Sequence, residues 1–235
     1  MRPLSLPLPL RARVLFLLAL GAVAAILASC GSASHALAPT ATPVTWATAS
    51  PGTVLFESDW SKGLAGWQAS AGWSVRDGLL EMDGLDQRTL TIPYQPTVRD
   101  YAVEFQLQVV SEPQDEGYFR LQAAPTPDAS GFRAEVFHLL TPIPHQGGDH
   151  PTAVVSVLPL DAQDPASGRP IDFEPHDTMR TYHVEVRENT VKFATDKATL
   201  SAAVGMKTKT LSHGPLTIEC GLAFLRFGQI RVTAL

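Results

Sequence analysis

The chain has 235 residues, of which 45% are hydrophobic and 17% charged, a composition typical of a folded protein with a rather neutral surface. Three of its 18 Lys and Arg residues precede Cys30 without any acid, so the remainder carries 15 basic against 23 acidic residues, a net charge of −8. An acidic domain repels phosphate backbones, and no basic stripe with interleaved aromatic residues occurs, which argues against a nucleic-acid partner.

The first 29 residues have the pattern of an export signal. Arg11 and Arg13 form its basic region, and residues 14–28 form an apolar run that is too short for a comfortable membrane span. The stretch Leu27-Ala-Ser-Cys30-Gly31 resembles the lipobox of bacterial lipoproteins at each of its positions. That resemblance implies cleavage before Cys30, diacylation of its sulfur, and an extracytoplasmic protein anchored to a membrane by lipid. An ordinary secretory signal beside an unrelated cysteine is the alternative.

Residues 30–52 follow as a segment rich in Ala, Ser, Thr and Pro, without charge or hydrophobic periodicity. Such a composition predicts a flexible tether between the lipid and a folded domain. Trp46 is the large aromatic residue of this segment. The sequence leaves open whether it contacts lipid headgroups or the domain.

Residues 53–235 read as one domain made of short strands. Apolar and polar residues alternate in several segments, the Asp77-Gly78 pair is a hairpin signal, and helical periodicity never persists for three turns. The expected strands include 54–56, 73–75, 79–82, 101–109, 153–158, 182–186, 191–193, 216–220 and 230–232. Regular short strands with turn signals predict an all-β fold, an antiparallel β-sandwich.

Cys220 is left without a disulfide partner if Cys30 carries lipid. In the strand expected at 216–220, alternation places Cys220 on the same face as Leu216 and Ile218. We therefore expect a small buried apolar residue. A catalytic thiol is the less favoured interpretation, because no His or Lys lies close in sequence to activate it.

Several motifs in residues 53–235 resemble the concanavalin A-like lectin and glucanase jelly rolls. The nearest branch is that of the laminin-G-like and 3-keto-disaccharide hydrolase-like extracellular modules. The motifs are Phe56-Glu-Ser-Asp-Trp60, Gly66-Trp67, Gly72-Trp73-Ser-Val, Asp77-Gly-Leu-Leu80, Gly117-Tyr-Phe-Arg120, Gly131-Phe-Arg133, Tyr182-His-Val-Glu-Val186 and Phe227-Gly-Gln-Ile-Arg-Val232. The resemblance implies a concanavalin A-like jelly roll in which Trp60, Trp67 and Trp73 pack the fold.

Glucanases of this fold carry a Glu-x-Asp-x-x-Glu pattern on one strand, and this sequence has no such pattern. The acid-rich stretch 112–116 has the wrong spacing and reads as a solvated turn. Domains of this kind often bind calcium, but no tight acidic cluster suggests where it would bind. A candidate metal site consists of His145, Asp149 and His150. The alternative is that these residues belong to a mobile polar loop that binds no metal. We therefore assign no metal.

A ligand-binding face has better support in the sequence than a catalytic or metal site. Alternation in the segment 118–122 directs Tyr118 and Arg120 away from the core, and in 132–136 it directs Arg133 and Glu135 the same way. Adjacent strands would then present an aromatic ring beside planar hydrogen-bonding groups, which suits stacking on and hydrogen bonding to a sugar. Cross-strand charge pairing on a solvated sheet is the alternative.

The sequence thus predicts a membrane-anchored extracytoplasmic lipoprotein whose jelly-roll domain binds a ligand, a carbohydrate by preference, without catalysis. A first alternative is a glycoside hydrolase of the 3-keto-disaccharide type, with a site built from Arg133, Glu135 and the His145–His150 loop. A second is a module that binds a protein partner of the envelope through the Pro- and His-rich insertion at 141–180.

Overall fold

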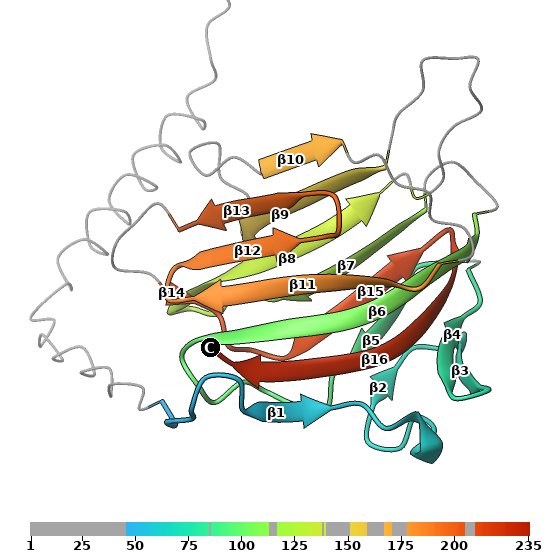
Figure 1. Ribbon diagram of the computed structural model, residues 1–235, viewed down its shortest axis with the longest axis horizontal. Coiled ribbons are helices and arrows are strands. Elements are labelled where there is room, and N and C mark those ends of the chain that lie inside the picture. Colours follow the sequence, from blue (N-terminus) through green and yellow to red (C-terminus); the bar gives the residue numbers. More distant parts are fainter. Residues whose placement is uncertain are drawn as a thin grey trace, which may run out of the picture. The chain divides into compact units, whose positions relative to one another are not determined.

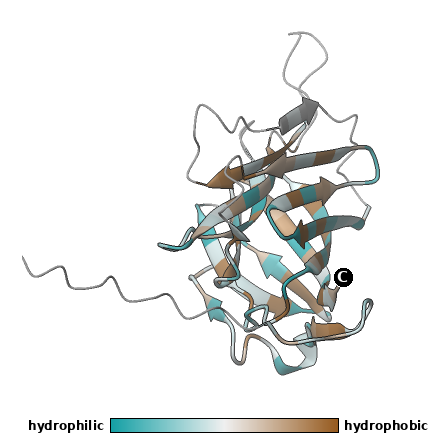
Figure 2. Ribbon diagram, turned by 90° about the vertical axis from the view of Figure 1, so that its left-hand side faces the viewer, coloured by the Kyte–Doolittle hydropathy of each residue, from teal (hydrophilic) through white to brown (hydrophobic). Residues whose placement is uncertain are grey.

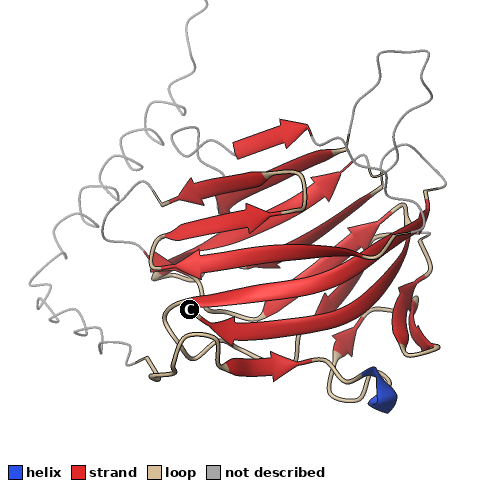
Figure 3. Ribbon diagram, viewed as in Figure 1, coloured by secondary structure: helices blue, strands red, loops and turns tan. Residues whose placement is uncertain are grey.

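The computed structural model describes residues 46–84, 86–112, 117–137, 139, 151–158, 167–170, 178–204 and 210–235. All of them fall in the compact unit Thr45–Leu235. Within these residues two eight-stranded, almost entirely antiparallel sheets stack face to face (Figures 1 and 3), with one short 3-10 helix, η1 (Trp60–Lys62). The predicted antiparallel β-sandwich is confirmed.

Sheet A has the strand order β13-β12-β11-β6-β16-β4-β3. Strand β4 pairs with the first half of β16, and β1 pairs with the last residues of β16. Its strands are β1 (Val54–Glu57), β3 (Trp73–Arg76), β4 (Leu79–Met82), β6 (Tyr101–Ser111), β11 (Arg180–Arg187), β12 (Thr190–Ala194), β13 (Thr199–Ala203) and β16 (Phe224–Ala234). The last strand of the chain, β16, thus lies inside the sheet and pairs along the length of β6.

Sheet B has the order β10-β9-β8-β7-β15-β5-β2, and β14 pairs in parallel with β8. Its strands are β2 (Gln68–Ala69), β5 (Arg88–Thr91), β7 (Tyr118–Ala123), β8 (Ala129–Phe137), β9 (Thr152–Leu158), β10 (Ser167–Pro170), β14 (Thr210–Leu211) and β15 (Leu216–Gly221). The strand predicted at 153–158 is β9, so part of the 141–180 insertion widens sheet B beside β8.

The core lies between the sheets and follows the two-residue alternation of the strands. In β6 the residues predicted to face inward are buried, and the polar residues between them are partly exposed. Phe105 of β6 stacks on Tyr182 of β11 at 5.4 Å between ring centroids, and it meets Phe119 of sheet B edge-on at 5.9 Å. Figure 2 shows hydrophobic and hydrophilic residues alternating along the strands.

The tryptophans of the N-terminal motifs pack as predicted. Trp60 and Trp73 are buried, and the partly buried Trp67 lies against Trp60 at 4.9 Å between ring centroids. The Trp60 indole N–H donates to the carbonyl of Gly228 at 2.6 Å, which ties η1 to β16. Cys220 is also fully buried, and burial raises the pKa of its thiol.

The predicted hairpin at Asp77-Gly78 joins β3 to β4. Both residues have positive φ, 52° and 74°, as the central pair of a type I′ turn requires. A two-residue turn of this hand matches the twist of the strands it joins.

The first described residues are bound to the domain. The Trp46 ring lies 4.1 Å from the ring of His213, the Ala47 N–H donates to Thr97, and the Gly52 N–H donates to Ala234. Trp46 therefore contacts the domain, one of the two possibilities left open above. The predicted signal segment and Cys30 lie outside the described residues. No helix in the described part of the chain is long and apolar enough to span a membrane.

Candidate functional site

Two neighbouring strands of sheet B, β7 and β8, bring the four predicted site residues together. Pairing places Arg120 of β7 opposite Glu135 of β8, and Gln122 opposite Arg133. On the other side of β7, Arg120 lies opposite Glu219 of β15. The residues between them in sequence are buried in the core, so these side chains point outward. We call this outward surface the polar face; it comprises Tyr118, Arg120, Gln122, Arg133, Glu135, Thr217 and Glu219.

Glu219 is the most buried member of the polar face, with 5% of its surface exposed. Three side chains of β7 donate to its carboxylate: the Tyr118 hydroxyl at 3.1 Å, the Gln122 amide at 3.4 Å and the Arg120 guanidinium. A buried carboxylate is tolerated only when it is paired and hydrogen-bonded, and this one is both. Glu219 therefore fixes the positions of the outward side chains of β7.

Arg120 links two carboxylates. One of its terminal nitrogens pairs with Glu219, and the other lies 3.6 Å from a carboxylate oxygen of Glu135. Its guanidinium also lies over the Tyr118 ring, 4.9 Å from the centroid. With these contacts Arg120 acts as a connecting group within the face.

Tyr118 is held by the protein on several sides. Besides its contacts with Glu219 and Arg120, its ring lies close against Gly221, where a Cβ atom would come within 2.8 Å of the ring. Burial, together with the negative charge of Glu219, raises the pKa of Tyr118 to about 12, so its hydroxyl stays protonated and donates. Sugar stacking on this ring, as expected from the sequence, remains a prediction.

Arg133 and Glu135 have fewer contacts with neighbouring side chains than the residues around Glu219. The partly buried Arg133 makes no hydrogen bond or ion pair with any described residue, and its Nε atom is buried without a partner. Burial raises the pKa of Glu135, although the charges of Arg133 and Arg120 oppose the shift. In one half of the polar face, around Glu219, the side chains hydrogen-bond to one another. In the other half, around Arg133, hydrogen-bonding groups have no partner among the described residues.

Sequence reasoning missed Glu219 as a member of the site. Alternation in 216–220 directs Glu219 outward together with Thr217, on the side opposite the buried Leu216, Ile218 and Cys220. What the sequence did not reveal is that β15 inserts between β5 and β7, which places Glu219 beside Arg120.

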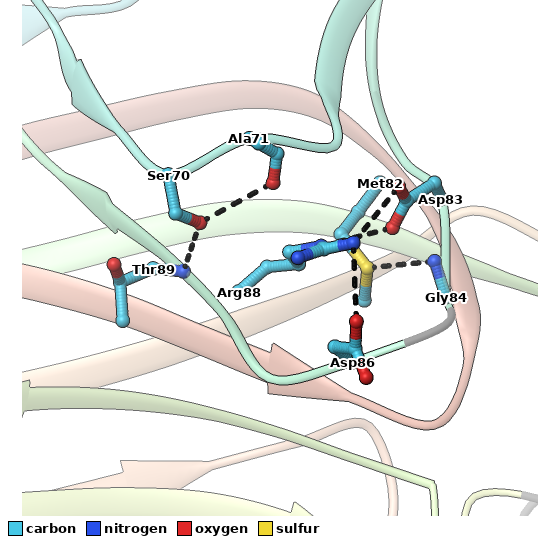
Figure 4. Close-up of polar contacts among 8 residues, drawn as sticks. All are labelled: Ser70, Ala71, Met82, Asp83, Gly84, Asp86, Arg88 and Thr89. Atoms are coloured by element: carbon cyan, nitrogen blue, oxygen red, sulfur yellow. Dashed lines mark hydrogen bonds and ion pairs between the residues drawn. The ribbon is translucent and has the colours of Figure 1, made fainter.

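A second polar cluster ties the loop after β4 to β5 (Figure 4). Arg88 forms a two-pronged ion pair with Asp83, at 3.0 and 3.2 Å, and lies 3.6 Å from Asp86. Its guanidinium thus occupies the space between two carboxylates. Among the described residues no group of three or more His, Cys, Asp or Glu is arranged to hold a metal ion. The His145, Asp149 and His150 candidate lies outside the described residues.

No protein-family model matches the chain, and no curated protein matches its sequence. Solved structures do share its fold. A protein with a galectin-like fold from Bacillus subtilis matches with a TM-score of 0.57 and 10% identity, over 79% of this chain and 97% of that one. A β-glucanase from Bacillus licheniformis matches with a TM-score of 0.54 and 12% identity, over 78% and 99%.

The exoplasmic domain of VIP36, in a form bound to Ca2+ and Man3GlcNAc, matches with a TM-score of 0.52 and 13% identity, over 72% of this chain and 84% of that one. At such identities the likeness shows the fold alone. The domain therefore has the jelly-roll fold found in lectins and glucanases, as the sequence motifs predicted.

We predict that Glu219→Ala lowers the free energy of unfolding by about 2–4 kcal/mol, because Arg120 and Tyr118 lose the acceptor around which they are arranged. Chemical denaturation measures the change. Glu104→Ala, at an outward carboxylate of sheet A that is 42% exposed, is the matched control and should cost under about 1 kcal/mol. Equal losses for the two variants would contradict the structural role assigned to Glu219.

The raised pKa of Glu135 predicts a pH dependence of stability. The folded domain holds this proton more tightly than the unfolded chain, whose ordinary value is 4.5. The corresponding stability is fully present below that value and is lost as the pH rises through the raised pKa. Relative to the parent, Glu135→Gln should therefore become more stable as the pH is raised.

Glu185 on sheet A provides a control of opposite sign. Burial raises its pKa, but Lys192 and His183 outweigh that effect, and the net shift is downward. Its stabilising effect is present above the ordinary value and is lost as the pH falls through the lowered pKa. Glu185→Gln should therefore become less stable than the parent as the pH is raised. Denaturation of both variants across the pH range checks this, and parallel pH trends would refute the prediction.

Proposed function

We propose that this protein is an extracytoplasmic lipoprotein, anchored to a membrane by lipid on Cys30, whose jelly-roll domain binds a carbohydrate without catalysis. The observation that carries the binding proposal is the polar face of sheet B. It combines a rigid, internally hydrogen-bonded half with an arginine that has no partner among the described residues. Tyr118, Arg120, Arg133 and Glu135 are the proposed binding residues, and Glu219 orders them.

The chemistry of the face suits a sugar. Sugar hydroxyls both donate and accept, so their recognition needs planar groups of both kinds in fixed positions. Arg133 and Gln122 provide donors, and Glu135 provides an acceptor. Because Glu219 already holds the side chains of β7 in place, little conformational entropy is lost when a ligand binds.

The structural neighbours support a carbohydrate as the ligand class. They include a β-glucanase and the VIP36 domain in a form bound to Man3GlcNAc. That same VIP36 structure contains Ca2+, which keeps calcium among the conditions to test here.

A hydrolase is the second candidate, and one observation favours it. Glu135 has a raised pKa, as a general acid requires, and Glu219 supplies a second carboxylate across Arg120. Against it, Glu219 already accepts hydrogen bonds from three side chains, which makes it a poor base or nucleophile. Binding without turnover is therefore the function we favour.

The binding proposal predicts that residues 31–235, screened against glycans and polysaccharides with and without calcium, bind a saccharide without releasing product. The double variant Arg133→Ala/Glu135→Ala should weaken that binding at least tenfold, about 1.4 kcal/mol. Arg231→Ala, at an ion-paired arginine of sheet A, should not change it. Sugar release abolished by Glu135→Gln would instead establish the hydrolase. Absence of binding to every saccharide would refute the proposal and favour a protein partner.

The anchor proposal predicts that cells expressing the full chain incorporate labelled fatty acid into it. Cys30→Ala should abolish the label and leave the precursor uncleaved, because the acylated sulfur is gone. Cys220→Ala is the control, since that thiol is buried, and it should leave labelling intact. Unchanged labelling of Cys30→Ala would contradict the lipobox interpretation.

A further inference from the structure

Arg133 stands apart from the other arginines of the domain. Nine arginine side chains are described, and eight have a carboxylate within 4.0 Å: Arg76, Arg88, Arg99, Arg120, Arg180, Arg187, Arg226 and Arg231. Arg133 has none among the described residues, although it is partly buried and its Nε atom is shielded from solvent. The terminal nitrogens of Arg133, which form no hydrogen bond or ion pair with a described residue, are therefore the atoms available to an external anion.

A buried donor that lacks an acceptor is unfavourable, and the Nε atoms of Arg120, Arg133 and Arg180 are all in this state. Arg133 differs from the other two because no described carboxylate pairs with its terminal nitrogens. The planar fork of arginine matches a carboxylate or sulfate with two parallel hydrogen bonds, which a neutral hydroxyl does not offer.

Arg133 also lies within a row of polar side chains that crosses the sheet, and the other members of the row are uncharged. The pairing registers align this row perpendicular to the strands. Its members are Ser156 of β9, Arg133 of β8, Gln122 of β7, Thr217 of β15, Thr91 of β5 and Gln68 of β2. Paired residues point to the same side of a sheet. Ser156 is buried, so the accessible part of the row runs from Arg133 to Gln68, about 19 Å at roughly 4.8 Å per strand.

The far end of the row opens into a hollow of about 250 Å³ at the edge of the sheet. Gln68 and Thr91 line it together with Tyr94, Gln95 and Pro215. Tyr94 is stacked on Phe56 at 6.0 Å between ring centroids, so its position is fixed. Amide groups beside a fixed aromatic ring form a suitable surface for a neutral sugar unit.

Building on the proposed function, we propose that the ligand is an acidic heteropolysaccharide. Arg133 binds the carboxylate or sulfate of one sugar unit, and neutral units follow the polar row toward the hollow at Tyr94. The ligand carries sparse charge, because Arg133 is the one arginine of the row and the domain around it is acidic. Repulsion from distant acidic residues is screened beyond about 8 Å at physiological salt, whereas the contact at Arg133 is direct.

The test compares each acidic oligosaccharide with its own neutralised form. Residues 31–235 are titrated with a glucuronate-containing hetero-oligosaccharide and with the same oligosaccharide after carboxyl reduction. A sulfated oligosaccharide and its desulfated form make a second pair, which distinguishes the two anions. We expect at least tenfold tighter binding of one acidic form over its neutral counterpart, and we expect the preference to shrink as salt is raised.

Variants assign the effect to Arg133. Arg133→Gln should lower the affinity for the acidic form to that for the neutral form, whereas Arg133→Lys should keep part of the preference. Arg226→Gln, on the outward side of sheet A, should keep all of it. Tyr94→Ala should weaken the binding of long oligosaccharides more than that of short ones. Unfolding curves confirm that each variant is folded.

The failures are distinguishable. Equal affinity for the acidic and neutral forms, or a charge preference that survives Arg133→Gln, would overturn this inference and leave carbohydrate binding in place. If no saccharide bound in either form, the proposed function would fail, and this inference would fail with it.

Discussion

The alternation of side chains along each β-strand, with a period of two residues, determines both the core and the outer surface of this domain. Each strand that buries one set of side chains between the sheets must turn the alternate set outward, and both sets are fixed by the same packing. Phe119 is held in the core against Phe105 and Tyr182, so its neighbours Tyr118 and Arg120 have no choice of side. The polar face is therefore a consequence of the core, and a register slip of one residue would exchange the two.

On that face one buried carboxylate organises the rest. Glu219 draws the donors of β7 toward itself, and Arg120 carries the arrangement across to Glu135. Arg120 already pairs with both carboxylates, so Arg133 is the guanidinium of the polar face that has no carboxylate partner among the described residues. The division between an internally satisfied half and an available half follows from charge and position, and it is this division that suits a binding surface.

The local features of the domain could be predicted from its sequence. Alternation identified the main strands and the inward side of β6, and Asp77-Gly78 identified a hairpin whose two turn residues have positive φ. The partners of those strands could not be predicted, because sheet order depends on contacts between distant segments. For that reason Glu219 and the isolation of Arg133 emerged only from the fold. The sequence alone does not show what Trp46 contacts. In the structure its ring packs on His213, because backbone hydrogen bonds of Ala47 and Gly52 hold the end of the predicted tether against the domain.

Arg133 is the cation that we propose to be available for a ligand on the polar face. The most direct test of this proposal is an NMR titration that follows the Nε–Hε resonances of the arginines while a saccharide ligand is added. We expect the Arg133 resonance to shift until the site is saturated and the Arg120 resonance to shift less. The resonances of Arg226 and Arg231 on sheet A should stay in place. Saturable binding that shifts the sheet A resonances and leaves Arg133 unchanged would contradict the proposal.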